Sequence, residues 1–235
     1  MLTSYLNQLS ACDRYNIDPS DILPRHIYAK CRSKWLPLMR EYLGNRRVRV
    51  GENITILFEN SITVRHQIQE ILYWETRNDA DANLRTHEEL DLYRSLIPSR
   101  YRLTATLLVD GGTRESGLSF GEALTKQQPC IGLSIGNYQV PAQLADGDPD
   151  PAEPVKYLYF DLSREQRRAL TSGTPISVWV LEDGKRLIKL LPASTIKHLV
   201  EDFKDVTPLE LAEEKRNSNR TDWPEQKAVA SAASC

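Results

Sequence analysis

Residues 175–191, PISVWVLEDGKRLIKLL, constrain the fold more than any other stretch, because two apolar, β-branched runs flank an Asp-Gly pair. Such a pair favours a tight turn that joins two antiparallel strands. Two further pairs of strand-like runs repeat this pattern, around Glu52-Asn53 and around Gly136-Asn137. Each hairpin makes its two strands antiparallel neighbours, so the sequence predicts a mainly antiparallel sheet.

Segments with helical periodicity separate the hairpins. Apolar residues recur at helical spacing over 22–43, where Pro37 predicts a break into two helices and Gly44-Asn45 predicts the C-terminal cap. Ser61 is expected to cap a second helix that runs to about residue 78. The remaining helical patterns cover 88–96, 113–126, 164–170 and 193–203, and single strand patterns cover 101–110 and 155–163. The sequence therefore predicts an α+β fold, a mainly antiparallel sheet built from hairpins with helices packed on it.

Length and composition indicate the domain organisation. The chain has 235 residues, of which 40% are hydrophobic, so it can bury a sizeable core. We expect residues 1–207 to form a single α+β domain, with a loop or linker at 141–155 where prolines stand among acidic residues. Residues 208–235 lose the apolar periodicity, and we expect them to be a charged, disordered tail.

Charge and hydropathy exclude several classes of partner. The formal net charge of −2 provides no general attraction to nucleic acid or to an anionic membrane. The chain has neither a secretory signal nor an apolar run of about 18 residues that could span a bilayer. We therefore expect a cytoplasmic protein that binds neither nucleic acid nor membrane.

Short motifs suggest activities that their surroundings do not favour. Residues 132–136 match the GxSxG motif of hydrolases, but a strand pattern follows Ser134 where a helix is needed, so a hairpin is expected. No glycine-rich phosphate-binding motif occurs, and no nucleotide cofactor is expected. Three acidic residues have the spacing of a calcium loop without its later glycine and glutamate, and we expect a solvated acidic loop at Asp146, Asp148 and Asp150.

Arginines form a short basic stripe before the first hairpin. Arg46, Arg47 and Arg49 alternate with valine in part of a strand pattern. This pattern is typical of a solvated strand face, and the alternative is a site for anions or RNA.

Residues 56–77, ILFENSITVRHQIQEILYWETR, contain the candidate site. A strand pattern stops at Glu59-Asn60, next to the partial positive charge of the following helix, and that helix is rich in polar side chains. His66 and Glu70 stand at positions i and i+4, so they share one helix face. We expect the polar side chains to converge at the strand-to-helix junction. The candidate residues are Glu59, Asn60, Gln67, Glu70 and Glu75.

Three kinds of role suit these residue types. Glu59, His66 and Glu70 combine carboxylates with an imidazole, a set that suits iron, manganese or zinc. Glu70 or Glu75 could instead serve an unassigned enzyme as a general base. The third alternative is structural, with Glu59 or Asn60 at the helix N-terminus and Glu70 paired with an arginine.

The same segments resemble a family of bacterial proteins, the domain-of-unknown-function family 3501. The resemblance runs from about residue 21 to residue 206 and rests on the FEN motif at 58–60 and on Glu75-Thr76-Arg77, which stands where the family has a Glu-Arg motif. The matching positions are Phe58, Glu59, Asn60, Thr63, Gln67, Glu70, Glu75, Glu89, Leu90, Tyr93 and Pro98.

The family has no established activity, but the resemblance implies a link to redox metabolism or oxidative stress, with rubrerythrin-like or iron–sulphur oxidoreductase proteins as partners. This chain has Tyr157-Leu158 and Leu181-Glu182-Asp183 where relatives tend to carry His-Phe and His-Pro. We therefore expect a homo-oligomeric accessory protein that binds a ligand or a metal. The alternative is a non-catalytic interaction or structural protein, a homodimer in which the FEN and helix residues form a buried polar network.

Overall fold

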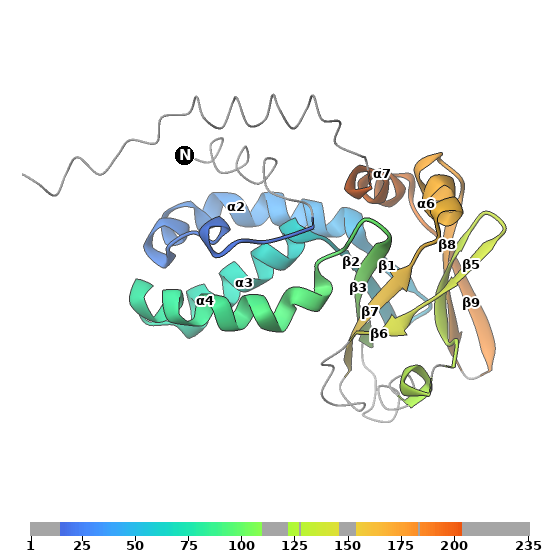
Figure 1. The fold of residues 1–235 in the computed structure, drawn as a ribbon, viewed down its shortest axis with the longest axis horizontal. Helices are drawn as coiled ribbons and strands as arrows, with labels where there is room; N and C mark the ends of the chain where they lie inside the picture. The colour runs from blue at the N-terminus through green and yellow to red at the C-terminus, as the bar shows by residue number, and fades with distance from the viewer. Residues whose placement is uncertain (1–14, 110–121, 127, 146–153, 183, 204–235) are drawn as a thin grey trace, which may run out of the picture. The chain divides into compact units, whose positions relative to one another are not determined.

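The predicted hairpins build two antiparallel sheets, which lie to the right of the long helices in Figure 1. The first sheet has the strand order β1-β2-β3-β7-β6 and the second has the order β5-β4-β8-β9. The strands of the first sheet are β1 (Arg47–Val50), β2 (Ile54–Glu59), β3 (Arg102–Val109), β7 (Val155–Asp161) and β6 (Gln143–Leu144). Those of the second are β5 (Tyr138–Pro141), β4 (Ile131–Ile135), β8 (Ile176–Glu182) and β9 (Lys185–Leu190).

The computed structural model describes residues 15–109, 122–126, 128–145, 154–182 and 184–203. All of them belong to Met1–Lys204, one of the two units into which the chain divides. The expected tail at 208–235, the three aspartates of the acidic loop and most of the expected helix at 113–126 lie outside the described residues.

The helices that the structure describes fall into two groups. The long helices α2 (Arg25–Arg46), α3 (Ser61–Glu75) and α4 (Asp79–Tyr93) lie side by side (Figure 1). The short helices α6 (Arg164–Thr171) and α7 (Ala193–Asp202) pack against the sheets, and the 3-10 turns are η1 (Pro19–Asp21) and η2 (Arg94–Leu96). The predicted α+β fold is confirmed. None of the described helices has the length and apolar character that crossing a bilayer requires.

The two faces of the first sheet have different partners. On β2, Ile54, Ile56 and Phe58 join one hydrophobic core with residues of the second sheet and of α6 and α7. The opposite face meets η2, where Thr104 donates a hydrogen bond to the carbonyl of Leu96 at 2.7 Å, and α3, where Thr63 donates one to Glu59. Glu59 pairs with Thr104 in the β2–β3 register, so its side chain belongs to this second face.

The predicted break at Pro37 is wrong, because α2 continues through it. Pro37 is exposed, so water can satisfy the carbonyl that loses its helical hydrogen bond. Trp35 and Met39, on either side of Pro37, are both buried in one cluster with Tyr28. Burial of this apolar stripe against α3 keeps the two halves of the helix in line.

Other predicted boundaries also move. Asn60 rather than Ser61 caps α3, and that helix ends at Glu75. Helix α4 begins at Asp79 behind the cap Asn78, well before residue 88, because its polar first half still buries Ala82. Part of the expected loop at 141–155 is strand, since β6 pairs with β7.

The GxSxG motif is a hairpin, as predicted. Ser134 lies on β4, and its hydroxyl bonds the Gln139 side chain across the β4–β5 pair at 3.0–3.1 Å. A Cβ on Gly132 would lie 2.3 Å from the Trp179 ring, so glycine is needed there for packing. Gly136 has a φ of +56°, which the turn requires.

Candidate functional site

The FEN motif places a carboxylate in the interior at the end of β2. The Glu59 side chain is buried and accepts hydrogen bonds from the hydroxyls of Thr63 and Thr106, the latter at 2.7 Å. Thr63 lies on the first turn of α3, and Thr106 lies on β3. Burial raises the pKa of Glu59, although the two threonine hydrogen bonds oppose this shift.

Asn60 uses its whole side-chain amide to join three helices. Its Oδ1 accepts from the backbone N–H groups of Ile62 and Thr63 at 3.1 and 3.0 Å, which caps α3. Its Nδ2 donates to the hydroxyl of Tyr42 on α2 at 2.7 Å and to Oδ1 of Asp202 on α7 at 2.8 Å. A serine or threonine cap has no second donor of this kind, so the amide is needed here.

Arg46 completes this junction, and its position corrects the expectation of a solvated arginine stripe. It is the last residue of α2, and its side chain is 0% exposed. The guanidinium donates to the carbonyls of Phe58 and Glu59 at 2.8 and 3.2 Å and forms an ion pair with Asp202. The other two arginines of the stripe, Arg47 and Arg49, are exposed, as predicted for the strand face. We call Tyr42, Arg46, Glu59, Asn60 and Asp202 the junction network.

Glu70 lies further along α3 in a separate set of contacts. Arg32 of α2 holds both of its carboxylate oxygens, with Nε and Nη2 at 2.8 and 2.7 Å, and the Tyr28 hydroxyl donates to it at 2.5 Å. Partial burial would raise the pKa of Glu70, but the hydrogen bonds from Arg32 and Tyr28 outweigh it and lower that pKa. Glu70 is therefore an ionised partner of Arg32.

The same arginine stacks on aromatic rings. The Arg32 guanidinium carbon lies 4.9 Å from the centroid of Tyr73 and 5.0 Å from that of Trp74. Arg25 covers Tyr73 from a distance of 5.1 Å. The Trp74 side chain itself is 67% exposed. We call Arg25, Arg32, Tyr73 and Trp74 the arginine–aromatic patch.

The remaining candidates have separate surroundings. The His66 Nδ1 accepts from Nε1 of Trp35 at 3.3 Å, and burial lowers the pKa of this imidazole. Glu75 is exposed and pairs with Arg85 at 3.0 Å. Gln67 is half-buried and makes no side-chain hydrogen bond with the described part of the chain.

The expected single cluster thus divides in two. Glu70 follows Asn60 by ten residues of helix, which is about 15 Å along the axis. The i, i+4 spacing places side chains on one face of the helix, but side chains at the start of that face and further along it remain far apart. Among the described residues, no group of three or more His, Cys, Asp or Glu side chains is placed to hold a metal ion. Glu59, His66 and Glu70 therefore form no such group, and Thr63, Trp35 and Arg32 respectively donate hydrogen bonds to them.

Sequence reasoning missed the residues that surround Asn60, and it expected an arginine beside Glu70 without identifying which one. Arg46 and Tyr42 stand four residues apart at the end of a helical pattern, a spacing that could have placed them on one face. No local signal points to Asp202, which is 142 residues from Asn60. The arginine expected beside Glu70 is Arg32.

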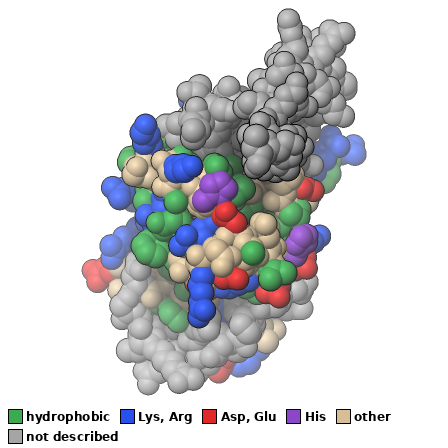
Figure 2. Space-filling model, turned by 90° about the vertical axis from the view of Figure 1, so that its left-hand side faces the viewer, with side chains coloured by type: hydrophobic (Ala, Val, Ile, Leu, Met, Phe, Trp, Pro, Cys, Tyr) green, Lys and Arg blue, Asp and Glu red, His purple; other side chains and the backbone are tan. Residues whose placement is uncertain are grey.

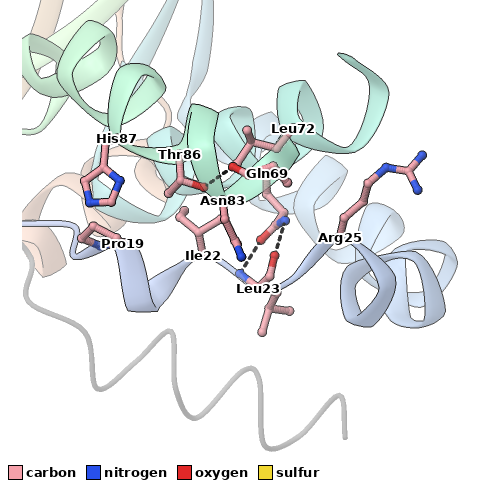
Figure 3. A pocket seen from close by; sticks show the side chains of 10 residues that line it. Pro19, Ile22, Leu23, Arg25, Gln69, Leu72, Asn83, Thr86 and His87 are labelled. Carbon is pink, nitrogen blue, oxygen red and sulfur yellow. Dashed lines mark hydrogen bonds between the residues drawn. The ribbon is translucent and has the colours of Figure 1, made fainter. Parts of the chain in front are cut away.

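A cavity of 150 Å³ lies beside the first turn of α2 (Figure 3). Within it the Gln69 side chain accepts from the N–H of Leu23 at 2.8 Å and donates to the Leu23 carbonyl at 3.0 Å. The cavity contains none of the predicted site residues, and its lining has no carboxylate. It is lined by Pro19, Ile22, Leu23, Arg25, Gln69, Leu72, Ala82, Asn83, Thr86 and His87.

Charge types are mixed on the described surface of the face that lies on the left in Figure 1. Figure 2 shows basic, acidic, histidine and apolar side chains interspersed there, without a continuous field of one sign. Elsewhere on the described surface, the side chains of His26 on α2 and Asp79 on α4 also bring opposite charge types together, at 2.5 Å. A face of mixed charge suits contact with protein rather than with a polyanion.

Comparisons with known proteins identify a family and a fold. One solved structure, described as a novel protein of unknown function from Burkholderia pseudomallei K96243, matches with a TM-score of 0.67 and 23% sequence identity. The match covers 80% of this chain and 99% of that one, and it supports the fold alone. No curated protein matches. The model of a family described as "Protein of unknown function (DUF3501)" matches residues 16–203, so this chain belongs to that family.

Proposed function

We propose that this protein is a non-catalytic interaction protein of redox metabolism that binds a partner protein through the arginine–aromatic patch. The observation that carries the proposal is Trp74, which is 67% exposed beside an arginine already held in place. Tryptophan, tyrosine and arginine are the residue types that dominate binding energy at protein interfaces. The patch supplies all three types at the surface.

Glu70 has a positioning role in this proposal. Its two hydrogen bonds to Arg32 fix the plane of the guanidinium, and the ring of Tyr73 supports it. A side chain held in this way loses little conformational entropy when a partner covers it. Glu70, which the sequence suggests as a ligand group, thus serves to hold Arg32 in the orientation that a partner would contact.

The contacts of the carboxylates favour this role over catalysis or metal binding. A general base needs a free lone pair and a pKa near the working pH. Glu70 has a lowered pKa and its oxygens are occupied. The junction network likewise uses Glu59 and Asn60 to join α2, α3 and α7 to the sheets.

The redox link rests on the family resemblance. It names the partners to test first, a rubrerythrin-like protein and an iron–sulphur oxidoreductase from the same cytoplasm. A second copy of the chain is the other occupant to test, because a homodimer through the patch would also cover Trp74.

The experiment measures binding of the purified full chain to each of these proteins by biolayer interferometry, and self-association by sedimentation velocity. Trp74→Ala should weaken the complex or the dimer by about tenfold or more, which corresponds to about 1.4 kcal/mol. Leu92→Ala is the matched control, because Leu92 is 62% exposed and lies on α4 outside the patch, seven residues beyond Arg85, the partner of Glu75. Equal effects of the two substitutions, or a monomer that binds neither protein, would refute the proposal.

A further inference from the structure

The edge strand of the second sheet leaves apolar side chains in solvent. Among the described strands, β9 pairs with β8 alone, and Ile188 and Leu190 are 64% and 60% exposed. In the described part of the chain, no backbone hydrogen bond reaches the other edge of β9. Exposed edges of this kind are usually shortened, covered or charged, because they accept further strands.

Basic side chains surround these apolar residues. Lys185, Arg186 and Lys189 belong to β9 and are exposed. Neither lysine forms an ion pair with a carboxylate that the structure describes, and Glu182 pairs with Lys185 in the strand register without an ion pair between them. Arg186 instead covers the Trp179 ring at 4.5 Å.

The edge of the first sheet adds to the same positive region. Strand β1 lies beside β9, and a Cβ on Gly51, directly after β1, would lie 2.8 Å from Leu187 Cδ1. Arg47 and Arg49 are exposed on β1. Within the described part of the chain, the two sheet edges therefore combine backbone groups that have no hydrogen-bonded partner, aliphatic side chains and an excess of positive charge.

We propose that the β9 edge binds an extended segment of another protein in which acidic and aliphatic side chains alternate. Such a segment can add to the sheet as a strand, with main-chain hydrogen bonds along β9. Its aliphatic side chains would cover Ile188 and Leu190, and its carboxylates would meet Lys185 and Lys189. Charge complementarity selects this occupant.

Charge also disfavours the other occupants. Antiparallel pairing of β9 with its own copy brings basic side chains together, and like charges directly opposite are destabilising. Nucleic acid does not match Ile188 and Leu190, because its bases stack on aromatic rings rather than on aliphatic side chains.

The experiment uses fluorescence anisotropy of the full chain with a labelled peptide of about ten residues that alternates glutamate and valine, a length that spans an edge strand. The comparison probes are the same peptide with lysine for glutamate and an oligothymidylate of equal length. The double substitution Lys185→Glu/Lys189→Glu should weaken binding of the acidic peptide about tenfold or more. Lys30→Glu/Lys34→Glu makes the same charge change on exposed α2 positions and should change binding less than about twofold.

Ile188→Ser should also weaken the peptide complex, whereas Trp74→Ala should leave it unchanged, which separates this edge from the arginine–aromatic patch. Absence of binding, equal binding of the lysine peptide, tighter binding of the oligothymidylate or equal effects of the two double substitutions would each overturn the proposal.

Discussion

Asp202→Asn should destabilise the protein by about 2–4 kcal/mol, because it leaves the Arg46 guanidinium buried without a charged partner. The Arg46 side chain is 0% exposed and that of Asp202 is 12% exposed. Breaking a buried ion pair by removing one partner costs about 3–5 kcal/mol. Asp202 is the last residue of α7, where a negative charge opposes the helix dipole, so its neutralisation returns about 1 kcal/mol. The difference is the expected loss.

Urea unfolding followed by tryptophan fluorescence measures this loss by linear extrapolation. Asp161→Asn is the matched control, since Asp161 also pairs with an arginine, Arg102, at 2.6 and 3.1 Å. That pair is largely exposed, 41% and 48% for the two side chains, so its loss should be about 1 kcal/mol or less.

A second variant separates the charge from the packing. Arg46→Met removes the buried charge, and adding Asp202→Leu to it should cost far less than Asp202→Asn costs in the wild type, because no charge is then stranded. If Asp202→Asn lowers the free energy of unfolding by less than about 1 kcal/mol, or by the same amount as Asp161→Asn, the reasoning about the junction network is refuted.

Four other changes test further parts of the structure, each by urea unfolding. Glu70→Gln should cost roughly 1–2 kcal/mol, because the side chains of Glu70 and Arg32 are each 22% exposed, so their ion pair is partly screened by water. No measurable cost would contradict the paired role. Gly44→Ala should stabilise by about 0.5–1 kcal/mol, because no atom lies within 4 Å of the new Cβ. Gly132→Ala should destabilise by about 2 kcal/mol or more, because its Cβ would lie 2.3 Å from the Trp179 ring; opposite signs would refute the packing. Glu59 has a raised pKa in the folded protein, so its contribution to stability is present below the ordinary value of 4.5 and is lost as pH rises through the folded value. Glu59→Gln should remove that loss, and an unchanged pH profile would contradict the burial argument.

The sequence alone predicted the elements that depend on near neighbours. The turn at Gly136-Asn137 and the hairpin of β8 and β9 follow from turn residues between strand-like runs. Polar residues at the end of β2 also marked the start of α3, although the cap is Asn60 and not Ser61. These features come from backbone preferences and side-chain spacing within a few residues, which a single sequence displays.

Tertiary structure alone decided how the candidate residues are used. Pro37 signals a break, but burial of Trp35 and Met39 keeps α2 continuous. Glu59 and Glu70 belong to one segment, yet Thr106 and Arg32 hold them in separate sites. The physical reason is that a buried polar group must find a partner wherever packing brings one within reach. That partner can come from any part of the chain, and its identity is not encoded in local periodicity.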